Sequence, residues 1–402
     1  MKIGITTSVI QRGRSGVGQY VLSLVRALLP HAAQHEFSLF VLEEDAPHFS
    51  FAKDAMRIVP VEEKFRAPIR DILWHQTALP RLARKLALDV LHVPSYRRMV
   101  AHAPCAKVAT IHDLAPFRLA GKYDRLRMIY GRVVAKRLAR RQDAVIAVSE
   151  ATASDIRQFF GIGAHRITTV HNGIDHARFN QTGTAEAPAE VARRWNLEQP
   201  YFLFVSRLEH PGKNHVRLIA AYEQFRRSTG LPWTLALGGG DWHGVEAIRA
   251  RAAASPFAAD IRFLGFVPDA DLPALYQAAG AMVYPSLFEG FGLPPIEAMA
   301  CGCPVISSTR GALCEVVGNA AWIVDPEDEE SIASALAVFA NSPGMRAGWR
   351  HRGLEHARRF SWADTAAQTL DTYQRAAALH HPATANTPIH HPPASKYESA
   401  TP

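Results

Sequence analysis

Two glutamates lie in one short segment, Glu289-Gly-Phe-Gly-Leu-Pro-Pro-Ile-Glu297. The segment follows a strand predicted over residues 281–284, and its two prolines predict a helix start, because proline has no N–H to leave unpaired in the first turn. Glycines ahead of a helix N-terminus let the backbone approach an anion, which that terminus attracts. Carboxylates placed there would bind hydroxyls, and a nucleotide sugar carries hydroxyls on both its ribose and its hexose. A helix with acidic residues in its first turn is the alternative.

Two cations follow a strand predicted over residues 201–205, in Ser206-Arg207-Leu208-Glu209-His210-Pro211-Gly212-Lys213-Asn214. The guanidinium fork of Arg207 and the ammonium of Lys213 both suit a diphosphate. Neutralising the charge that grows on a diphosphate leaving group would stabilise the transition state. The alternative is a surface turn with solvated cations, which the position at the carboxyl end of a strand disfavours.

Two further segments give weaker signals. Gly13-Arg-Ser-Gly16-Val-Gly18 follows the predicted first strand, but its glycine spacing matches neither a dinucleotide loop nor a P-loop, so it indicates an anion-facing turn or only a tight one. His112-Asp113 follows a strand predicted over residues 107–111. The neighbouring aspartate and the strand end make a catalytic or substrate-binding role for His112 as plausible as a structural one.

Asp269-Ala-Asp271 matches a D-x-D metal motif. It precedes Leu272-Pro273, so we interpret either aspartate as a helix N-cap with proline in the first turn. We therefore predict no catalytic metal and no cofactor, with arginine, lysine and a helix end taking the part that a divalent ion plays elsewhere.

The 402 residues are 48% hydrophobic and 20% charged, which is typical of a globular protein and excludes wholesale disorder or a fibrous repeat. No run approaches the ~18–20 apolar residues of a membrane span, and the N-terminus lacks a signal-peptide core. Four irregularly spaced cysteines are too few for a disulfide framework or a four-ligand zinc site. We expect a reducing cytoplasm.

Strand, loop and helix alternate along the chain, which predicts parallel α/β units. A polar stretch over residues 180–190 is the predicted linker, so two doubly wound domains should face each other across a cleft. The helix nearest the N-terminus is predicted over residues 19–29, after a loop over 11–18. The predicted strands cover residues 2–7, 37–42, 90–93, 107–111, 144–148, 166–170, 201–205, 234–237, 261–264, 281–284 and 304–307.

Charge is uneven between the two halves. Residues 1–180 carry 27 basic and 15 acidic side chains, a net of +12, whereas the remainder carries a net of −4. The first half should therefore face an anion: nucleic acid, phospholipid or a phosphorylated substrate. Nucleic acid is disfavoured, because no stacking aromatics accompany the basic residues and no binding motif occurs. Lys122–Arg141, with eight basic residues and one acid, predicts a basic amphipathic helix that lies either on anionic lipid or against its own domain.

Together these segments resemble the retaining GT-B glycosyltransferases of family 4, also called glycosyl transferases group 1, over nearly the whole chain to about Ala377. The two glutamates with seven residues between them are the most specific mark. Ala147-Val-Ser149-Glu150, Val170-His-Asn172-Gly173-Ile174-Asp175, Gly265-Phe-Val267-Pro268 and Phe360-Ser-Trp362 agree. The turn over residues 209–212 departs from the shorter or more basic turn of many relatives.

The resemblance implies a GT-B architecture of two Rossmann-like domains. Residues 1–180 would form the acceptor-side domain and residues 181–360 the domain that binds the nucleotide-sugar donor. A helix over residues 361–379 would cross back to the first domain. Residues 380–402, rich in Pro, Ala, Thr and His, are predicted to be a disordered tail.

The same resemblance implies site residues. The expected catalytic set is His112 near the anomeric carbon, Glu289 on the transferred sugar, and Arg207 and Lys213 on the diphosphate. Glu297 would hold the ribose. The remaining expected contacts are Gly16 with the phosphates, Val267 with the base through its backbone, and the backbone of Gly290, Phe291, Gly292 and Leu293 with the sugar.

The implied reaction moves a hexose from a nucleotide diphosphate sugar to a glycan or polyprenyl-linked acceptor in cell-surface polysaccharide or glycolipid assembly. It retains the anomeric configuration, with a phosphate oxygen taking the acceptor proton and no protein nucleophile. Mannose from GDP-mannose is the first expectation for the donor, with UDP-hexoses close behind. The alternatives are a nucleotide-sugar epimerase or phosphorylase-like enzyme of similar architecture and, less favoured, a basic nucleic-acid binder. The enzyme is expected in the cytoplasm, and on the inner face of the membrane as a peripheral protein if Lys122–Arg141 lies on anionic lipid.

Overall fold

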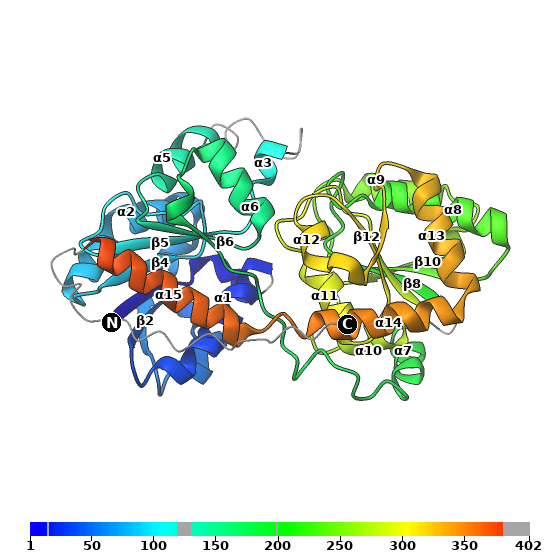
Figure 1. Ribbon diagram of the computed structural model, residues 1–402, viewed down its shortest axis with the longest axis horizontal. Coiled ribbons are helices and arrows are strands. Elements are labelled where there is room, and N and C mark those ends of the chain that lie inside the picture. Colours follow the sequence, from blue (N-terminus) through cyan, green and yellow to red (C-terminus); the bar gives the residue numbers. More distant parts are fainter. Residues whose placement is uncertain (14–15, 119–129, 198–199, 381–402) are drawn as a thin grey trace, which may run out of the picture.

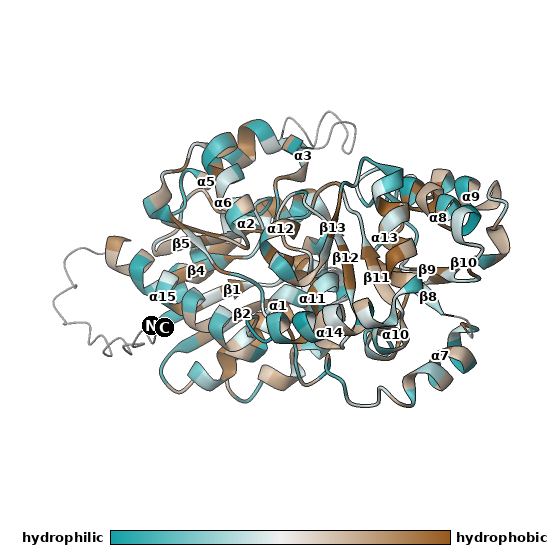
Figure 2. Cartoon of the chain, turned by 45° about the vertical axis from the view of Figure 1, so that its right-hand side comes forward, coloured by the Kyte–Doolittle hydropathy of each residue, from teal (hydrophilic) through white to brown (hydrophobic). Residues whose placement is uncertain are grey.

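Two α/β domains make up the chain in the computed structural model, which describes residues 1–13, 16–118, 130–197 and 200–380 (Figure 1). Each domain has one parallel sheet covered by helices. The two doubly wound domains predicted from the alternating pattern are confirmed. Most strand residues are buried, as expected for parallel strands that have helices on both faces. Figure 2 shows these strands as mainly hydrophobic, between helices whose outer faces are hydrophilic.

The described part of the first domain holds a seven-stranded sheet in the order β3-β2-β1-β4-β5-β6-β7. Every pairing in it is parallel, and β1 lies between β2 and β4. The chain order reverses on the two sides of β1, so its switch point lies between β1 and β4. The strands are β1 (Lys2–Thr6), β2 (Glu36–Leu42), β3 (Arg57–Val61), β4 (Val90–Val93), β5 (Ala106–Ile111), β6 (Ala144–Ala147) and β7 (Ile167–Thr169).

The described part of the second domain repeats this plan with a six-stranded parallel sheet in the order β10-β9-β8-β11-β12-β13. Its switch point lies between β8 and β11, which pair in parallel. In such sheets ligands bind outside the carboxyl ends of the strands at the switch point. The strands are β8 (Tyr201–Val205), β9 (Thr234–Gly238), β10 (Ile261–Gly265), β11 (Ala281–Tyr284), β12 (Val305–Ser308) and β13 (Trp322–Val324).

The helices of the first domain are α1 (Gly16–Leu28), α2 (Pro68–Lys85), α3 (Ala115–Arg118), α5 (Lys136–Ala139) and α6 (Glu150–Asp155). Those that follow are α7 (Ala187–Trp195), α8 (His215–Thr229), α9 (Val245–Ala253), α10 (Leu272–Ala278), α11 (Leu293–Ala300), α12 (Leu313–Val317), α13 (Glu329–Asn341), α14 (Pro343–Ala357) and α15 (Trp362–His380). Short 3-10 helices cover Ser8–Gly13, Leu29–His31, Glu43–Ala52, Glu63–Arg66, Ala164–Arg166, Ala258–Asp260 and Gly318–Ala320, and π-helical turns cover Tyr130–Ala135 and Ile156–Phe160. Among the described residues, no helix combines the length and the apolar character that crossing a bilayer requires.

Helix α15 belongs to the first domain by packing, although it follows the second domain in sequence. It leaves α14 and runs back along the first sheet, in contact with α1 and β4–β6 (Figure 1). Leu370, Tyr373 and Ala376 are buried in the first domain's core. The predicted helix that crosses back is therefore confirmed. Residues 381–402 of the predicted tail lie outside the described residues, and His380 ends α15.

Several local predictions were wrong. Residues 11–18 were predicted as a loop, but a 3-10 helix covers Ser8–Gly13 and α1 begins at Gly16, three residues before the predicted start. The buried face of α1 outweighs the low helix propensity of its glycines, which lie in the first turn. Strands β3 and β13, one edge strand of each sheet, were not predicted; in β3, Pro60 interrupts the apolar run. In the predicted linker over 180–190, α7 already begins at Ala187.

The predicted helix Lys122–Arg141 lies partly outside the described residues, because 122–129 are not described. The rest forms the π-helical turn Tyr130–Ala135 followed by α5, not one α-helix.

Candidate active site

The centre of the site is an ion pair between the two switch-point strands of the second domain. Lys213 lies in the turn after β8, and Glu289 lies in the loop after β11. Their Nζ and Oε1 atoms are 2.6 Å apart, and both side chains are mostly buried. Ser286 donates a second hydrogen bond to the same carboxylate oxygen at 2.7 Å. Leu287 N–H donates to the carbonyl of Gly212, which ties the two loops together.

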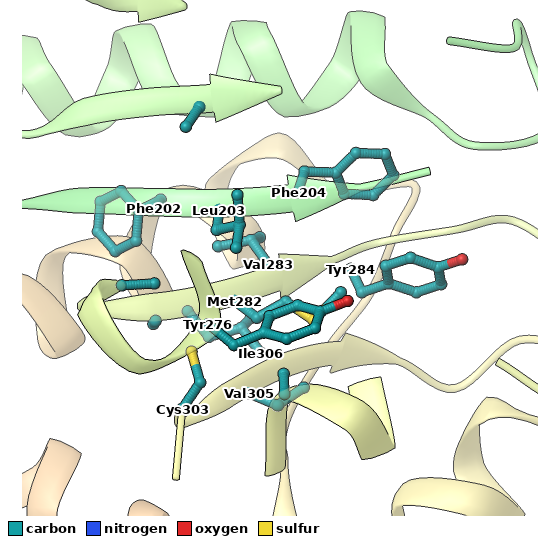
Figure 3. Packing of buried hydrophobic residues seen from close by; sticks show 14 of the residues in the cluster. Phe202, Leu203, Phe204, Tyr276, Met282, Val283, Tyr284, Cys303, Val305 and Ile306 are labelled. Carbon is teal, nitrogen blue, oxygen red and sulfur yellow. The ribbon is translucent and has the colours of Figure 1, made fainter. Parts of the chain in front are cut away.

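Tyr284, the last residue of β11, lies beneath this ion pair. Its ring stacks on Phe204 of β8, and its hydroxyl is 3.4 Å from Lys213 Nζ. Figure 3 shows the phenol oxygens of Tyr284 and Tyr276 both pointing toward the carboxyl ends of the strands. Burial first, and then the negative charges of nearby carboxylates, raise the pKa of Tyr284 well above its ordinary value. Those carboxylates are Glu289, Glu297 and Glu209, so the three acids gather around one phenol.

Glu297, on α11, is partly buried. Tyr276 of α10 donates a hydrogen bond to its carboxylate at 3.3 Å. Burial raises the pKa of Glu297 to about 7, against the opposing pull of Arg178. Near neutral pH this carboxyl group therefore exists in both forms, and a ligand whose hydroxyls donate to it would favour the ionised form.

Arg207 lies at the border of this group. Its guanidinium is 4.6 Å from the ring centre of Trp242 and 3.5 Å from the carboxylate of Glu209, which is 1% exposed. Half of the Arg207 side chain is exposed. The buried acid and the aromatic face restrict the guanidinium on two sides, while the rest stays open to a ligand.

The second domain meets the first at Gly290. A Cβ atom added to this glycine would lie 1.8 Å from the carbonyl oxygen of His112 and 2.8 Å from Cβ of Asp113. No other residue type therefore fits without movement. The structure thus brings His112, which follows β5, against the loop that carries Glu289.

His112 is held as a neutral imidazole. Its Nε2 is 3.2 Å from the carbonyl oxygen of Pro94, and because a carbonyl can only accept, Nε2 carries the proton and Nδ1 keeps a lone pair. Burial lowers the pKa of His112 to about 4, against the opposing effect of Asp113. The ring can therefore accept a hydrogen bond from a sugar hydroxyl at pH 7. Asp113 itself accepts from the N–H of Ala115, a local role at the start of α3.

The first turn of α6 completes the contact between the domains. Ser149 and Thr152 both donate their hydroxyls to the carbonyl of Gly290, at 2.8 and 3.3 Å. In the other direction, the carboxylate of Glu315 on α12 accepts from the N–H groups of Glu150 and Ala151 at 2.9 and 3.2 Å. We call these four hydrogen bonds the interdomain clamp. His171, in the segment that follows β7, adds to this contact, because its Nε2 is 2.6 Å from Oε1 of Glu315.

The other predicted site residues are placed as follows. Gly16 begins α1, and a Cβ added to it would meet nothing within 4 Å. Gly292 caps α11 at a φ of 95°, a conformation that favours glycine, and Leu293 is the first residue of that helix. The Phe291 ring packs against the rings of His171 and Phe360, at 5.8 and 5.9 Å between ring centres. Val267 follows β10 with its side chain buried, which leaves only its backbone for a base.

The D-x-D segment is not a capping motif in the way the sequence predicted. Asp271 occupies the N-cap position of α10 but makes no side-chain cap hydrogen bond; its carboxylate pairs with Arg194 at 2.7 Å. Asp269 pairs with Arg178 at 3.3 Å. Two separate arginines outcompete the backbone N–H groups for these carboxylates. Within the described ranges, no group of three or more His, Cys, Asp and Glu side chains has a metal-binding arrangement.

Sequence reasoning missed Tyr284, Ser286, Thr152 and Glu315. Tyr284 ends strand β11 and Ser286 follows it, and a strand end at a switch point indicates a ligand site. Thr152 and Glu315 carried no such signal, because each acts on a backbone group of the other domain.

Comparison with known proteins identifies relatives of both domains. Residues 14–178 match the family described as Glycosyltransferase Family 4, and residues 189–356 match Glycosyl transferases group 1. The O-antigen chain mannosyltransferase B of Escherichia coli is 30% identical over 400 residues, covering 93% of this chain and all of that protein. The serotype-specific mannosyltransferase WbdA of Escherichia coli is 25% identical over 390 residues, covering 90% of this chain and 46% of that protein. The crystal structure of HepE from Anabaena in complex with UDP and glucose superposes with a TM-score of 0.73 at 19% identity, covering 93% and 99% of the two chains.

Replacing Gly290 with alanine should separate the domains. The added methyl group cannot share space with the His112 carbonyl, so Gly290→Ala loses the two hydroxyl bonds to its own carbonyl, at roughly 0.5–1.5 kcal/mol each. We expect a lower melting temperature and a larger radius of gyration in small-angle scattering. Gly348→Ala, on α14 with open space around the site, is the matched control. An unchanged radius for Gly290→Ala would contradict the assignment of this contact.

Replacing Glu297 with glutamine should stabilise the unliganded protein in a pH-dependent way. A carboxyl pKa raised by folding means that the folded state penalises the ionised form, and the penalty grows as pH rises from about 4.5 to about 7. Glu297→Gln removes it, so its melting temperature should exceed the wild-type value at pH 8 and approach it at pH 5. After discounting for partial exposure, the gain at pH 8 is on the order of 1–2 kcal/mol. Glu190→Gln, at an exposed site on α7, is the control. An equal gain at both pH values would refute the raised pKa.

Proposed function

This chain belongs to glycosyltransferase family 4, the glycosyl transferases group 1, and from that premise we propose that it transfers mannose from GDP-mannose to a glycan or polyprenyl-linked acceptor. The chain is a glycosyltransferase of GT-B type. The proposal of mannose is supported by the relative that matches 93% of this chain over its own full length, whose name describes an O-antigen chain mannosyltransferase. Assembly of a cell-surface polysaccharide is the corresponding biological role.

The observation that carries the donor site is the Lys213–Glu289 pair at the switch point, with Tyr284 beneath it. We assign Lys213 and Arg207 to the diphosphate and Glu289 to the transferred sugar. In the unliganded state Lys213 has Glu289 as its partner, so the cation is already positioned when the phosphates arrive. The N-terminus of α11 adds its partial positive charge beside them.

The remaining donor contacts follow from burial and charge. Glu297 would accept hydrogen bonds from the ribose hydroxyls, and the Val267 backbone would face the base. His112, neutral with a lone pair on Nδ1, would contact the transferred sugar from the first domain. Gly16 leaves open space at the start of α1 for the phosphates to approach.

We propose that the reaction retains the anomeric configuration. The bond between the anomeric carbon and the β-phosphate oxygen breaks, the acceptor oxygen attacks from the same face, and its proton passes to a phosphate oxygen of the departing nucleoside diphosphate. Arg207 and Lys213 neutralise the charge on that leaving group, which electrostatic preorganisation makes worth several kcal/mol. In this scheme no protein nucleophile and no metal ion take part.

We also propose that the acceptor-side domain rests on an anionic membrane. Val133 and Val134 are exposed beside Arg132 and Arg137. Ile69 and Leu73, one turn apart at the start of α2, are also exposed, next to exposed Arg70. Each of these two segments thus presents apolar and cationic side chains together, a combination that suits anionic lipid.

A thermal-shift panel with GDP, UDP, ADP and dTDP tests the donor site. GDP should raise the melting temperature most, because a ligand at 100 times its Kd adds about 2.7 kcal/mol to the folded state. Lys213→Ala and Glu297→Ala should lose most of this shift, whereas Lys53→Ala, at an exposed lysine, should keep it. GDP-mannose turnover should continue in EDTA. Protection that is equal in wild type and Lys213→Ala, or activity abolished by EDTA, would overturn the proposal.

Sedimentation with vesicles tests the membrane surface. At low salt the protein should bind vesicles containing phosphatidylglycerol and not pure phosphatidylcholine, with each exposed cation near the surface contributing on the order of 1 kcal/mol. The double variant Ile69→Ser/Leu73→Ser should bind several-fold more weakly. Leu379→Ser, which changes an equally exposed leucine on α15, should bind as wild type does. Absence of binding to the anionic vesicles would remove this part of the proposal.

A further inference from the structure

The His112 imidazole has a second neighbour besides the Pro94 carbonyl. Tyr20 of α1 packs edge-on against it, with ring centres 4.7 Å apart and planes at 81°. Tyr20 is 1% exposed, so its ring has no freedom to move toward solvent. The Pro94 carbonyl restrains one nitrogen of the imidazole, and the Tyr20 ring restrains the orientation of its plane.

The Tyr20 hydroxyl begins a chain of buried hydrogen bonds. It lies 3.2 Å from Thr110 Oγ1, which is 2.8 Å from His92 Nε2; His92 Nδ1 is 2.7 Å from the hydroxyl of Tyr373. All four residues are at most 1% exposed. Burial lowers the pKa of His92 to about 3, so the ring is neutral and has one donor and one acceptor nitrogen. A neutral His92 can therefore make both of its bonds, one as donor and one as acceptor, to the hydroxyls of Thr110 and Tyr373.

This chain connects three strand and helix elements of the first domain to α15. His92 belongs to β4, Thr110 to β5 and Tyr20 to α1, whereas Tyr373 comes from the helix that returns from the second domain. Trp362, the first residue of α15, also contacts the Tyr20 ring at 5.9 Å. Two residues of α15 therefore restrain Tyr20, one directly and one through the hydrogen bonds.

We propose that Tyr20 is a positioning residue for the transfer reaction, which holds His112 in the orientation that meets the donor sugar and is itself anchored to α15 through Thr110, His92 and Tyr373. The inference rests on the proposed role of His112. None of the four residues touches the substrate. They act by limiting the motion of one side chain, and a misplacement of about 1 Å near a reacting centre lowers rates as much as 100-fold.

A buried chain of neutral polar groups suits this task. Its members bond to each other, so removing one leaves a buried partner unsatisfied and loosens the remainder. The hydroxyl of Tyr20 also distinguishes this residue from phenylalanine, which would fill the same space without an anchor. Tyr20 thus has two separate parts: its ring contacts His112, and its hydroxyl fixes the ring.

Two substitutions at Tyr20 separate these contributions. Tyr20→Phe removes only the anchor and should lower kcat for GDP-mannose about 3- to 10-fold, and Tyr20→Leu should lower it further. KM for the donor should change less than twofold, because the side chains assigned to the diphosphate and the ribose, Arg207, Lys213 and Glu297, belong to the other domain. Tyr201→Phe is the matched control: it also removes a buried tyrosine hydroxyl, one bonded to the Leu275 carbonyl at 2.7 Å, but far from His112 in the fold. It should leave kcat unchanged at a similar cost in melting temperature.

A double-variant cycle and a spectrum complete the test. In a His112→Ala background, Tyr20→Phe should have no further effect on kcat.

In nitrogen-15 histidine spectra, Tyr20→Phe should shift the ring resonances of His112 and His92, identified through His112→Ala and His92→Gln, while Tyr201→Phe should not. Spectral shifts without any GDP-mannose turnover in wild type would refute the proposed donor and leave the positioning role in place. Unshifted His112 resonances, or an equal loss of kcat in both backgrounds, would overturn the positioning role.

Discussion

The site depends on one close contact between backbones, Gly290 of the second domain against His112 of the first. Only a residue without a side chain permits it, and the Gly290 carbonyl then comes within reach of two hydroxyls from α6. Because the loop that carries Glu289 is hydrogen-bonded to the opposite domain, Glu289 and His112 keep one arrangement. Glu315 adds two bonds in the reverse direction, so a shift of either domain breaks hydrogen bonds that each domain makes to the other.

Within the second domain, Lys213 is held in one place before any ligand binds. It pairs with the Glu289 carboxylate and lies within reach of the Tyr284 hydroxyl, whose pKa the nearby acids raise. A cation held by a carboxylate and a phenol has already lost most of its rotamer freedom, so under the proposed function binding a diphosphate requires little further ordering. His112 is kept neutral by burial and adds no positive charge of its own.

Helix α15 gives the two domains a second covalent connection besides the segment that follows β7. Its first residue contacts Tyr20, its middle is buried against the first sheet, and its N-terminal neighbour Ser361 bridges to Ile174 of the other crossing segment. A movement of one domain relative to the other therefore acts at the start of the helix whose residues Trp362 and Tyr373 reach Tyr20, directly and through His92 and Thr110. If Tyr20 positions His112 as proposed, the interdomain clamp and this hydrogen-bonded chain respond to the same motion.

The sequence by itself determined the α/β alternation, most of the strands and the segments that carry Arg207, Lys213, Glu289 and Glu297, because buried parallel strands are continuous apolar runs and the polar residues at their ends stand out. It did not reveal β3, whose apolar run Pro60 interrupts, the short strand β13, or the arginines that draw Asp269 and Asp271 into ion pairs. Only the tertiary structure decided that Gly290 meets His112, that Glu315 receives the start of α6 and that Tyr373 reaches His92. These contacts join residues 164 to 281 positions apart through a carbonyl, an amide or a ring, and such groups leave no spacing pattern in the chain.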